Sequence, residues 1–164
     1  MIPKSERTQT KSQFFDSAIT LWSHVTDLLE KYYNDDYQYI VVTDEYGHQD
    51  MMPNPNFWRI KLFREQVETY MSNMISNLTH ADTIYISGKP ETVQYEYNIR
   101  RRYMTDAIGD LRTVEQLFQH EIKRNAKQAK ILRACVHEFK DQITSIKNWR
   151  QSDNKLLSKL LNKN

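Results

Sequence analysis

The chain has little glycine, proline or cysteine: its 164 residues include three glycines, four prolines and one cysteine. So few glycines argue against an all-β fold with many tight turns. The single cysteine, Cys135, excludes a disulfide within the chain and fits a reducing compartment. It also excludes any metal site that needs a pair of cysteines.

Long apolar runs are missing as well. No stretch approaches the roughly 18 apolar residues that span a bilayer, and the mean hydropathy is −0.77. The N-terminal stretch "MIPKSERTQTKSQ" is polar and lacks the apolar core of a secretory signal. We therefore expect a cytoplasmic protein with no membrane partner.

The motifs that carry common enzyme chemistry are also missing. The sequence contains no glycine-rich phosphate loop and no GxSxG nucleophile elbow. The five histidines are scattered, and Cys135 and His137, two residues apart, would lie on different faces of a helix. We expect no catalytic residues, no metal and no cofactor, and therefore no enzyme.

What the chain does contain is a helical period. Apolar residues recur at spacings of three and four, and this pattern predicts helices over about 11–39, 55–78 and 93–150. β-Branched and aromatic residues predict a short β element near 37–50 and 84–87. The fold class is therefore mainly α: a helical bundle with a long C-terminal helix or a helical hairpin.

These patterns divide the chain into four segments. They are a disordered N-terminus (1–10), a helical core domain (11–92), a long helical oligomerisation and basic region (93–150), and a short basic tail helix (151–164). The stretch "QSDN" at 151–154 is expected to break the preceding helix. Gly109 marks a second candidate break, because glycine costs about 1 kcal/mol inside a helix.

Two of the four prolines stand close together before the second predicted helix. Pro53 and Pro55 bias the residues before them away from helical backbone angles. Pro55 suits the first helical position, where its missing N–H costs nothing, and Asn54 would then be the N-cap. The segment is therefore predicted to be a turn that leads into an amphipathic helix.

The C-terminal half contains a regular apolar seam. At 1.5 Å per residue, one helix over 111–150 would span roughly 60 Å, too long for a compact globule of this size. The helix must therefore fold back or pair with another chain. The seam resembles that of a coiled coil, and its members are candidate oligomer-interface residues. They are Leu132, Val136, Phe139, Ile143, Ile146 and Trp149.

Charge is unevenly distributed along the chain. Residues 1–95 carry 8 basic and 13 acidic side chains, whereas residues 96–164 carry 15 basic and 8 acidic ones. Two basic groups are candidate nucleic-acid-binding residues, because clustered cations can track a phosphate backbone. They are Arg100, Arg101 and Arg102, and then Lys123, Arg124, Lys127, Lys130 and Arg133. A solvated helix face, or ion pairs with another subunit, would explain these groups as well.

Three stretches resemble the helical small-subunit family of phage DNA-packaging terminases. They are "TDLLEKYYNDDYQYIVV" (26–42), "DEYGHQDMMPNPNFWRI" (44–60) and "SNLTHADT" (76–83). In the third, Leu78 and Thr79 match a Gly-Leu-Thr-Pro ending of the family, while Asn77 replaces its glycine and His80 its proline. The region from 26 to 83, in which the three stretches lie, covers roughly a third of the chain.

This resemblance implies a non-enzymatic subunit that assembles into rings in the bacterial host, binds double-stranded phage DNA and regulates a large terminase subunit. The first 40 residues show no obvious helix-turn-helix. The pattern also allows two alternatives. One is a structural virion protein of the connector or scaffold type. The other is a small helical adaptor or inhibitor that binds another protein in phage–host conflict.

Overall fold

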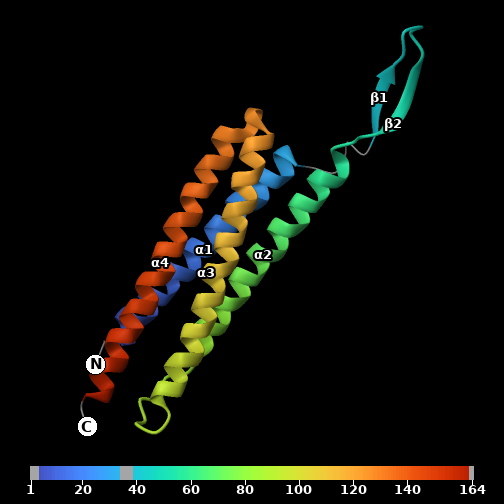
Figure 1. Ribbon diagram of the computed structural model, residues 1–164. Coiled ribbons are helices and arrows are strands. Elements are labelled where there is room, and N and C mark those ends of the chain that lie inside the picture. The colour runs from blue at the N-terminus through green and yellow to red at the C-terminus, as the bar shows by residue number, and fades with distance from the viewer. Residues whose placement is uncertain (1–3, 34–38, 163–164) are drawn as a thin grey trace.

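The computed structural model describes residues 4–33 and 39–162 (Figure 1). Within these ranges the fold is mainly α, as the sequence predicts, with four long helices and one two-stranded sheet. The helices are α1 (Lys4–Tyr32), α2 (Phe57–Thr83), α3 (Val93–Arg124) and α4 (Ala129–Leu161). Strands β1 (Tyr39–Thr43) and β2 (Gln49–Pro53) form an antiparallel hairpin, and a short 3-10 helix, η1 (Ala126–Gln128), precedes α4.

The helices form an elongated bundle, and the hairpin projects from one end of it (Figure 1). Helix α3 packs between α2 and α4, and α1 lies against α2 and α4. The α2–α3 loop and the last turns of α4 lie at the opposite end of the bundle from the hairpin.

Helices α3 and α4 form a hairpin, so the long C-terminal helical region folds back on itself. The reversal is at Asn125, whose side-chain oxygen accepts a hydrogen bond from the backbone N–H of Gln128 at 3.3 Å. Gly109 does not break α3. A β-carbon at this position would meet no atom within 4 Å, so the glycine lies on an open surface and the helix runs through it.

The boundaries around the double proline differ from the prediction. Helix α2 begins at Phe57 and not at Pro55, because the preceding residues form a turn. In this turn the backbone N–H of Phe57 donates to the carbonyl of Asn54, and the side chain of Asn54 accepts from the N–H of Asn56. Asn54 therefore caps a turn and not the helix.

Four other predicted features also differ. Helix α1 begins at Lys4, inside the segment 1–10 predicted to be disordered, and residues 1–3 lie outside the described residues. Helix α1 ends at Tyr32 and not at 39, residues 34–38 lie outside the described residues, and β1 begins at Tyr39. Residues 84–87 form a loop and not a strand. Helix α4 runs through 151–154 without a break, because Asp153 is held inside the bundle.

A row of aromatic rings connects the bundle near the α3–α4 turn. The ring of Tyr33 lies 5.0 Å from that of Phe63, Phe63 lies 5.6 Å from Phe118, and Phe118 lies 4.9 Å from Phe139. Tyr33 directly follows α1, and the other rings come from α2, α3 and α4. Aromatic pairs at these separations add to the free energy of burial, so this end of the bundle is tightly packed.

Candidate functional site

Five exposed basic side chains surround the α3–α4 turn, and we call this group the turn cluster. Its members are Lys123, Arg124, Lys127, Lys130 and Arg133. None of them forms an ion pair in the part of the chain that the structure describes. The only acidic residue between positions 119 and 133 is Glu121, which is buried. The turn cluster is therefore a positive surface without ion pairs among the described residues.

Helix dipoles explain only part of the turn cluster. Lys123 and Arg124 lie in the last turn of α3, where cations stabilise the partial negative charge of the helix end. Lys127 is the middle residue of η1, one position before Gln128, the N-cap of α4, and Lys130 is the second residue of α4. Both therefore lie near the start of α4, where the partial charge is positive and cations are unfavourable. Neither element has an acidic residue in its first turn. The helix dipole therefore does not explain why these two positions carry cations.

A network of hydrogen-bonded polar side chains lies beneath the α3–α4 turn. Glu121 accepts hydrogen bonds from Arg59 at 2.6 Å and from the Tyr33 hydroxyl at 3.1 Å. Asn125 donates to the same hydroxyl at 3.3 Å. Burial, and then the charge of Glu121, raise the pKa of Tyr33 above its ordinary value. These contacts join α1, α2 and α3 directly beneath the turn cluster and fix its backbone.

The first basic group has a different arrangement. Arg100 is buried and pairs with Asp153, so its guanidinium does not reach the surface. Arg101 and Arg102 are exposed near the start of α3. At 1.5 Å per residue they lie roughly 35 Å along α3 from Arg124. The structure therefore does not bring the two predicted basic groups into one site, and their role in DNA contact stays a prediction.

The six candidate oligomer-interface residues lie inside a single chain. Leu132, Val136, Phe139, Ile143, Ile146 and Trp149 are all buried in the core that α4 shares with the other helices. Their regular spacing is that of a helix in a bundle, which the sequence alone does not distinguish from a helix between two chains. Their role at an interface between chains stays a prediction.

The hairpin confirms the short β element predicted near 37–50, but the sequence did not predict that it would be exposed. Every residue of β1 and β2 is exposed, including apolar side chains on both faces. Val41 is 63% exposed and its cross-strand partner Met51 is 68% exposed. The composition of "YQYIVV" indicated a strand, but its projection away from the bundle depends on packing that the local sequence does not encode.

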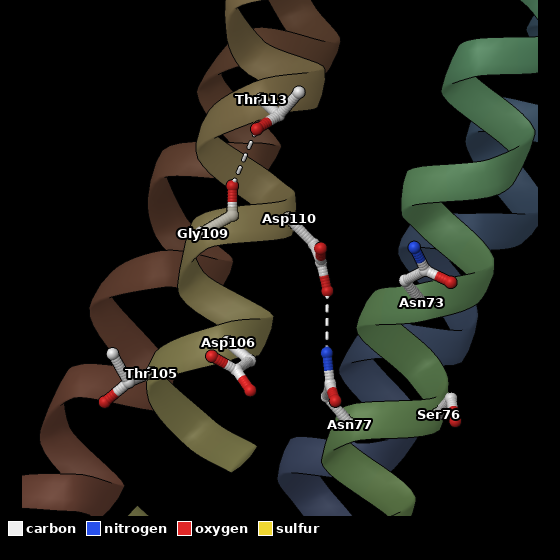
Figure 2. A pocket seen from close by; sticks show the side chains of 8 residues that line it. All are labelled: Asn73, Ser76, Asn77, Thr105, Asp106, Gly109, Asp110 and Thr113. Carbon is white, nitrogen blue, oxygen red and sulfur yellow. Dashed lines mark hydrogen bonds between the residues drawn. The ribbon is translucent and has the colours of Figure 1, made fainter. Parts of the chain in front are cut away.

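A shallow polar groove of about 520 Å³ lies between α2 and α3 (Figure 2). Asn77 donates a hydrogen bond to Asp110 at 2.8 Å across it, and Asp106 lies one turn away on α3. Burial, with Asp106 adding to it, raises the pKa of Asp110, while the bond from Asn77 lowers it. None of its hydroxyl groups, at Ser76, Thr105 and Thr113, is hydrogen-bonded to Asp106 or Asp110, so the geometry shows no activated nucleophile.

The described residues contain no cluster that would hold a metal. Groups of three or more His, Cys, Asp or Glu side chains in suitable positions do not occur among them. Cys135 is buried, and burial raises the pKa of its thiol to about 11. A thiol of this kind is a poor nucleophile near neutral pH.

No helix of the described chain is long and apolar enough to cross a membrane. No family model, curated protein or solved structure matches the chain. The turn cluster and the exposed hairpin are the two candidate functional surfaces of the described chain.

Proposed function

We propose that the chain is a non-enzymatic DNA-binding subunit that works as an oligomer in phage DNA packaging and regulates a large terminase subunit. The turn cluster would contact double-stranded DNA. The observation that carries the proposal is the set of five exposed cations without ion-pair partners in the described chain, held over a buried network. The packaging role rests on the resemblance in the sequence between 26 and 83.

The chemistry of the contact would be attraction to phosphates. Lysine and arginine side chains that neutralise phosphates release condensed counterions, which makes the affinity depend on salt. Each contact contributes a slope of about −0.9 in a plot of log K against log salt, so five contacts would give about −4.5. Such contacts position a protein on DNA without reading its sequence.

The start of α4 supports this reading over a merely solvated surface. Lys127 and Lys130 stand where helix electrostatics disfavours cations, at a cost of about 0.3–1 kcal/mol each. The backbone N–H groups of a helix start also attract anions. Together, the side chains and the helix start form a surface suited to a phosphate group.

The test is duplex-DNA binding measured by fluorescence anisotropy over a salt series. The variant changes Lys127 and Lys130 to Glu. A matched control makes the same charge change at Arg112 and Lys140, which are exposed and lie away from both ends of the bundle. We expect the first variant to lose DNA binding and the control to keep most of it.

Two results would contradict the proposal. One is a wild-type chain that does not bind duplex DNA even at low salt. The other is equal loss in both variants, because it would mean that net charge alone, and not the turn cluster, determines the affinity.

The exposed hairpin favours a second candidate function, that of a structural or adaptor protein that binds another protein. Its apolar side chains are a feature of protein-binding surfaces and not of DNA-binding ones. An oligomer that is indifferent to DNA would support this candidate over the first.

A further inference from the structure

We propose that the hairpin, residues 39–53, is an arm that docks on a second copy of this chain, at the end of the bundle opposite to its own. This inference rests on the oligomer of the proposed function and names the surfaces that would form it. The two partner surfaces are the hairpin arm and a basic end, which we define as residues 84–103 and 147–162.

The hairpin arm is unlike a free surface loop. Its cross-strand pairs place Tyr39, Val41, Met51 and Pro53 on one face, and Ile40, Val42 and Met52 on the other. All seven side chains are exposed. A two-stranded hairpin in water is marginally stable by itself, and exposed apolar patches are typical of protein-binding sites. The arm therefore gains stability when a partner covers it.

The edges of the arm are also unprotected. Proteins usually guard free strand edges with lysine, with proline inside the strand, or with a covering element. The arm contains no lysine, and its proline, Pro53, stands at the end of β2. Figure 1 shows no helix over either strand. These edges are open to another chain.

The charge of the arm identifies the partner. It carries three acidic residues, Asp44, Glu45 and Asp50, and no lysine or arginine. The basic end carries eight basic and three acidic side chains, a net charge of +5. Complementary charges on two surfaces steer association and fix its register. One chain therefore carries both halves of a charge-matched contact.

The basic end also offers apolar contacts. Tyr85 is 80% exposed and Tyr95 is 69% exposed, beside the exposed cations Arg101 and Arg102. Exposed tyrosines among arginines are typical of protein interfaces, where both residue types are enriched. An acidic arm with an apolar body would find both kinds of partner group here.

The positions of the two surfaces exclude a contact within one chain. The arm projects beyond one end of the bundle, and the basic end is at the other (Figure 1). A contact between different surfaces of identical chains is head-to-tail, and it produces a closed ring or an open filament. In such an assembly each copy adds one turn cluster, so a long DNA molecule would meet several clusters at once.

A charge-exchange experiment on the full chain tests the inference. The arm variant is Glu45→Lys with Asp50→Lys, and the basic-end variant is Arg101→Glu with Arg102→Glu. Asp44 is left unchanged because its carboxylate accepts hydrogen bonds from the N–H groups of Tyr46 and His48 in the turn. A control, Glu30→Lys with Glu65→Lys, makes the same charge change as the arm variant on exposed parts of α1 and α2.

Self-association is measured by sedimentation velocity over a range of protein and salt concentrations. We expect the wild type and the control to associate, and each reversed variant to associate about tenfold or more weakly. A mixture of the two reversed variants should associate again, because each carries the charges that the other lacks. Circular dichroism checks that the helices are unchanged.

A cross-linking measurement gives an independent answer. A chain with Tyr46→Cys is mixed with a chain with Tyr95→Cys and treated with a short bismaleimide. The native thiol of Cys135 is buried and does not compete. We expect a covalent dimer from the mixture and much less from either chain alone.

Three results would overturn the inference: a wild-type chain that is monomeric at every concentration, association that the arm variant leaves unchanged, or failure of the mixture to recover. Its failure is separable from that of the proposed function. Loss of DNA binding with charge exchange intact removes the proposed function alone, and a DNA-binding oligomer whose association the arm variant leaves unchanged removes the arm alone.

Discussion

Arg100 and Asp153 form a two-pronged ion pair inside the bundle. The Nε of Arg100 donates to one carboxylate oxygen of Asp153 at 2.8 Å, and a terminal guanidinium nitrogen donates to the other at 2.5 Å. The rings of Tyr97 and Trp149 flank the guanidinium. The pair joins the first turns of α3 to the last turns of α4, which explains why α4 continues through 151–154.

Removing one partner of this pair is predicted to destabilise the fold strongly. Asp153→Ala leaves a buried guanidinium without its counter-charge, which should lower the free energy of unfolding by about 3–5 kcal/mol. Arg100→Met combined with Asp153→Leu removes both charges and should cost much less. Urea denaturation measures both. If Asp153→Ala were as stable as the wild type, the ion pair between Arg100 and Asp153 would not be buried as described.

The turn cluster leads to an opposite prediction, a substitution that stabilises the fold and weakens binding. Lys127→Glu replaces an unfavourable cation at a helix start with a favourable anion, so it should raise the free energy of unfolding by about 0.5 kcal/mol. It also removes one phosphate contact, so the magnitude of the salt slope of DNA affinity should fall by about 0.9. Thermal unfolding and anisotropy measure the two effects.

The neutral variant Lys127→Gln is the matched control. It should reduce the salt slope by a similar amount but change stability less, because it adds no anion. If Lys127→Glu bound DNA like the wild type, the start of α4 would not be part of the contact.

The helices could be predicted from the sequence because their apolar spacing is local information. Phe118 and Phe139 lie in the core because each belongs to a regular stripe on its own helix. The burial of Arg100 could not be predicted from local spacing. In the run Arg100–Arg102 it resembles an exposed cation, and its partner Asp153 is 53 residues away in the chain. Only the pairing of α3 with α4 brings them together.

For the candidate surfaces, too, the sequence predicted the residue types but not their arrangement in space. The basic residues of the turn cluster were visible in the sequence, but their gathering around one turn depends on the reversal at Asn125. The strand composition of 37–42 was visible too. That β1 and β2 would project with both faces exposed was not, because exposure depends on which helices pack elsewhere.

The buried thiol of Cys135 predicts a loss of stability at alkaline pH. Burial, and then the nearby charge of Glu138, raise its pKa to about 11, above the ordinary value of about 8.5. Between these values the unfolded chain has released the thiol proton and the folded chain has kept it. Stability is therefore intact below about pH 8.5 and falls as pH rises, by up to about 1.4 kcal/mol per pH unit from this group.

Urea denaturation at about pH 7 and about pH 9.5 tests this, with Cys135→Ala as the comparison. The substitution changes packing at both pH values, so only the difference between them is informative. Tyr33, whose pKa is also raised, titrates above about pH 10 in the unfolded chain and stays outside this window. We expect the variant to lose less stability over the interval. Equal losses would mean that the thiol is not protected by burial.

The turn of the hairpin gives a way to disturb the arm without touching the bundle. Gly47 has a φ of +79°, a conformation that residues with a β-carbon rarely adopt, and its N–H donates to the carbonyl of Asp44 at 3.1 Å. Gly47→Val should destabilise this turn by more than about 1 kcal/mol. No atom lies within 4 Å of a β-carbon placed there, so the effect would come from backbone strain and not from a clash.

If the hairpin arm joins copies of the chain, Gly47→Val should weaken self-association while helicity and the urea midpoint of the bundle stay as in the wild type. Gly109→Ala is the matched control, since it changes an exposed glycine within a helix and should stabilise α3 slightly. Sedimentation velocity and circular dichroism on the same samples measure both properties. Full association of the Gly47→Val chain would show that the ordered arm is not needed for the contact. Loss of helicity would show that the arm supports the bundle itself.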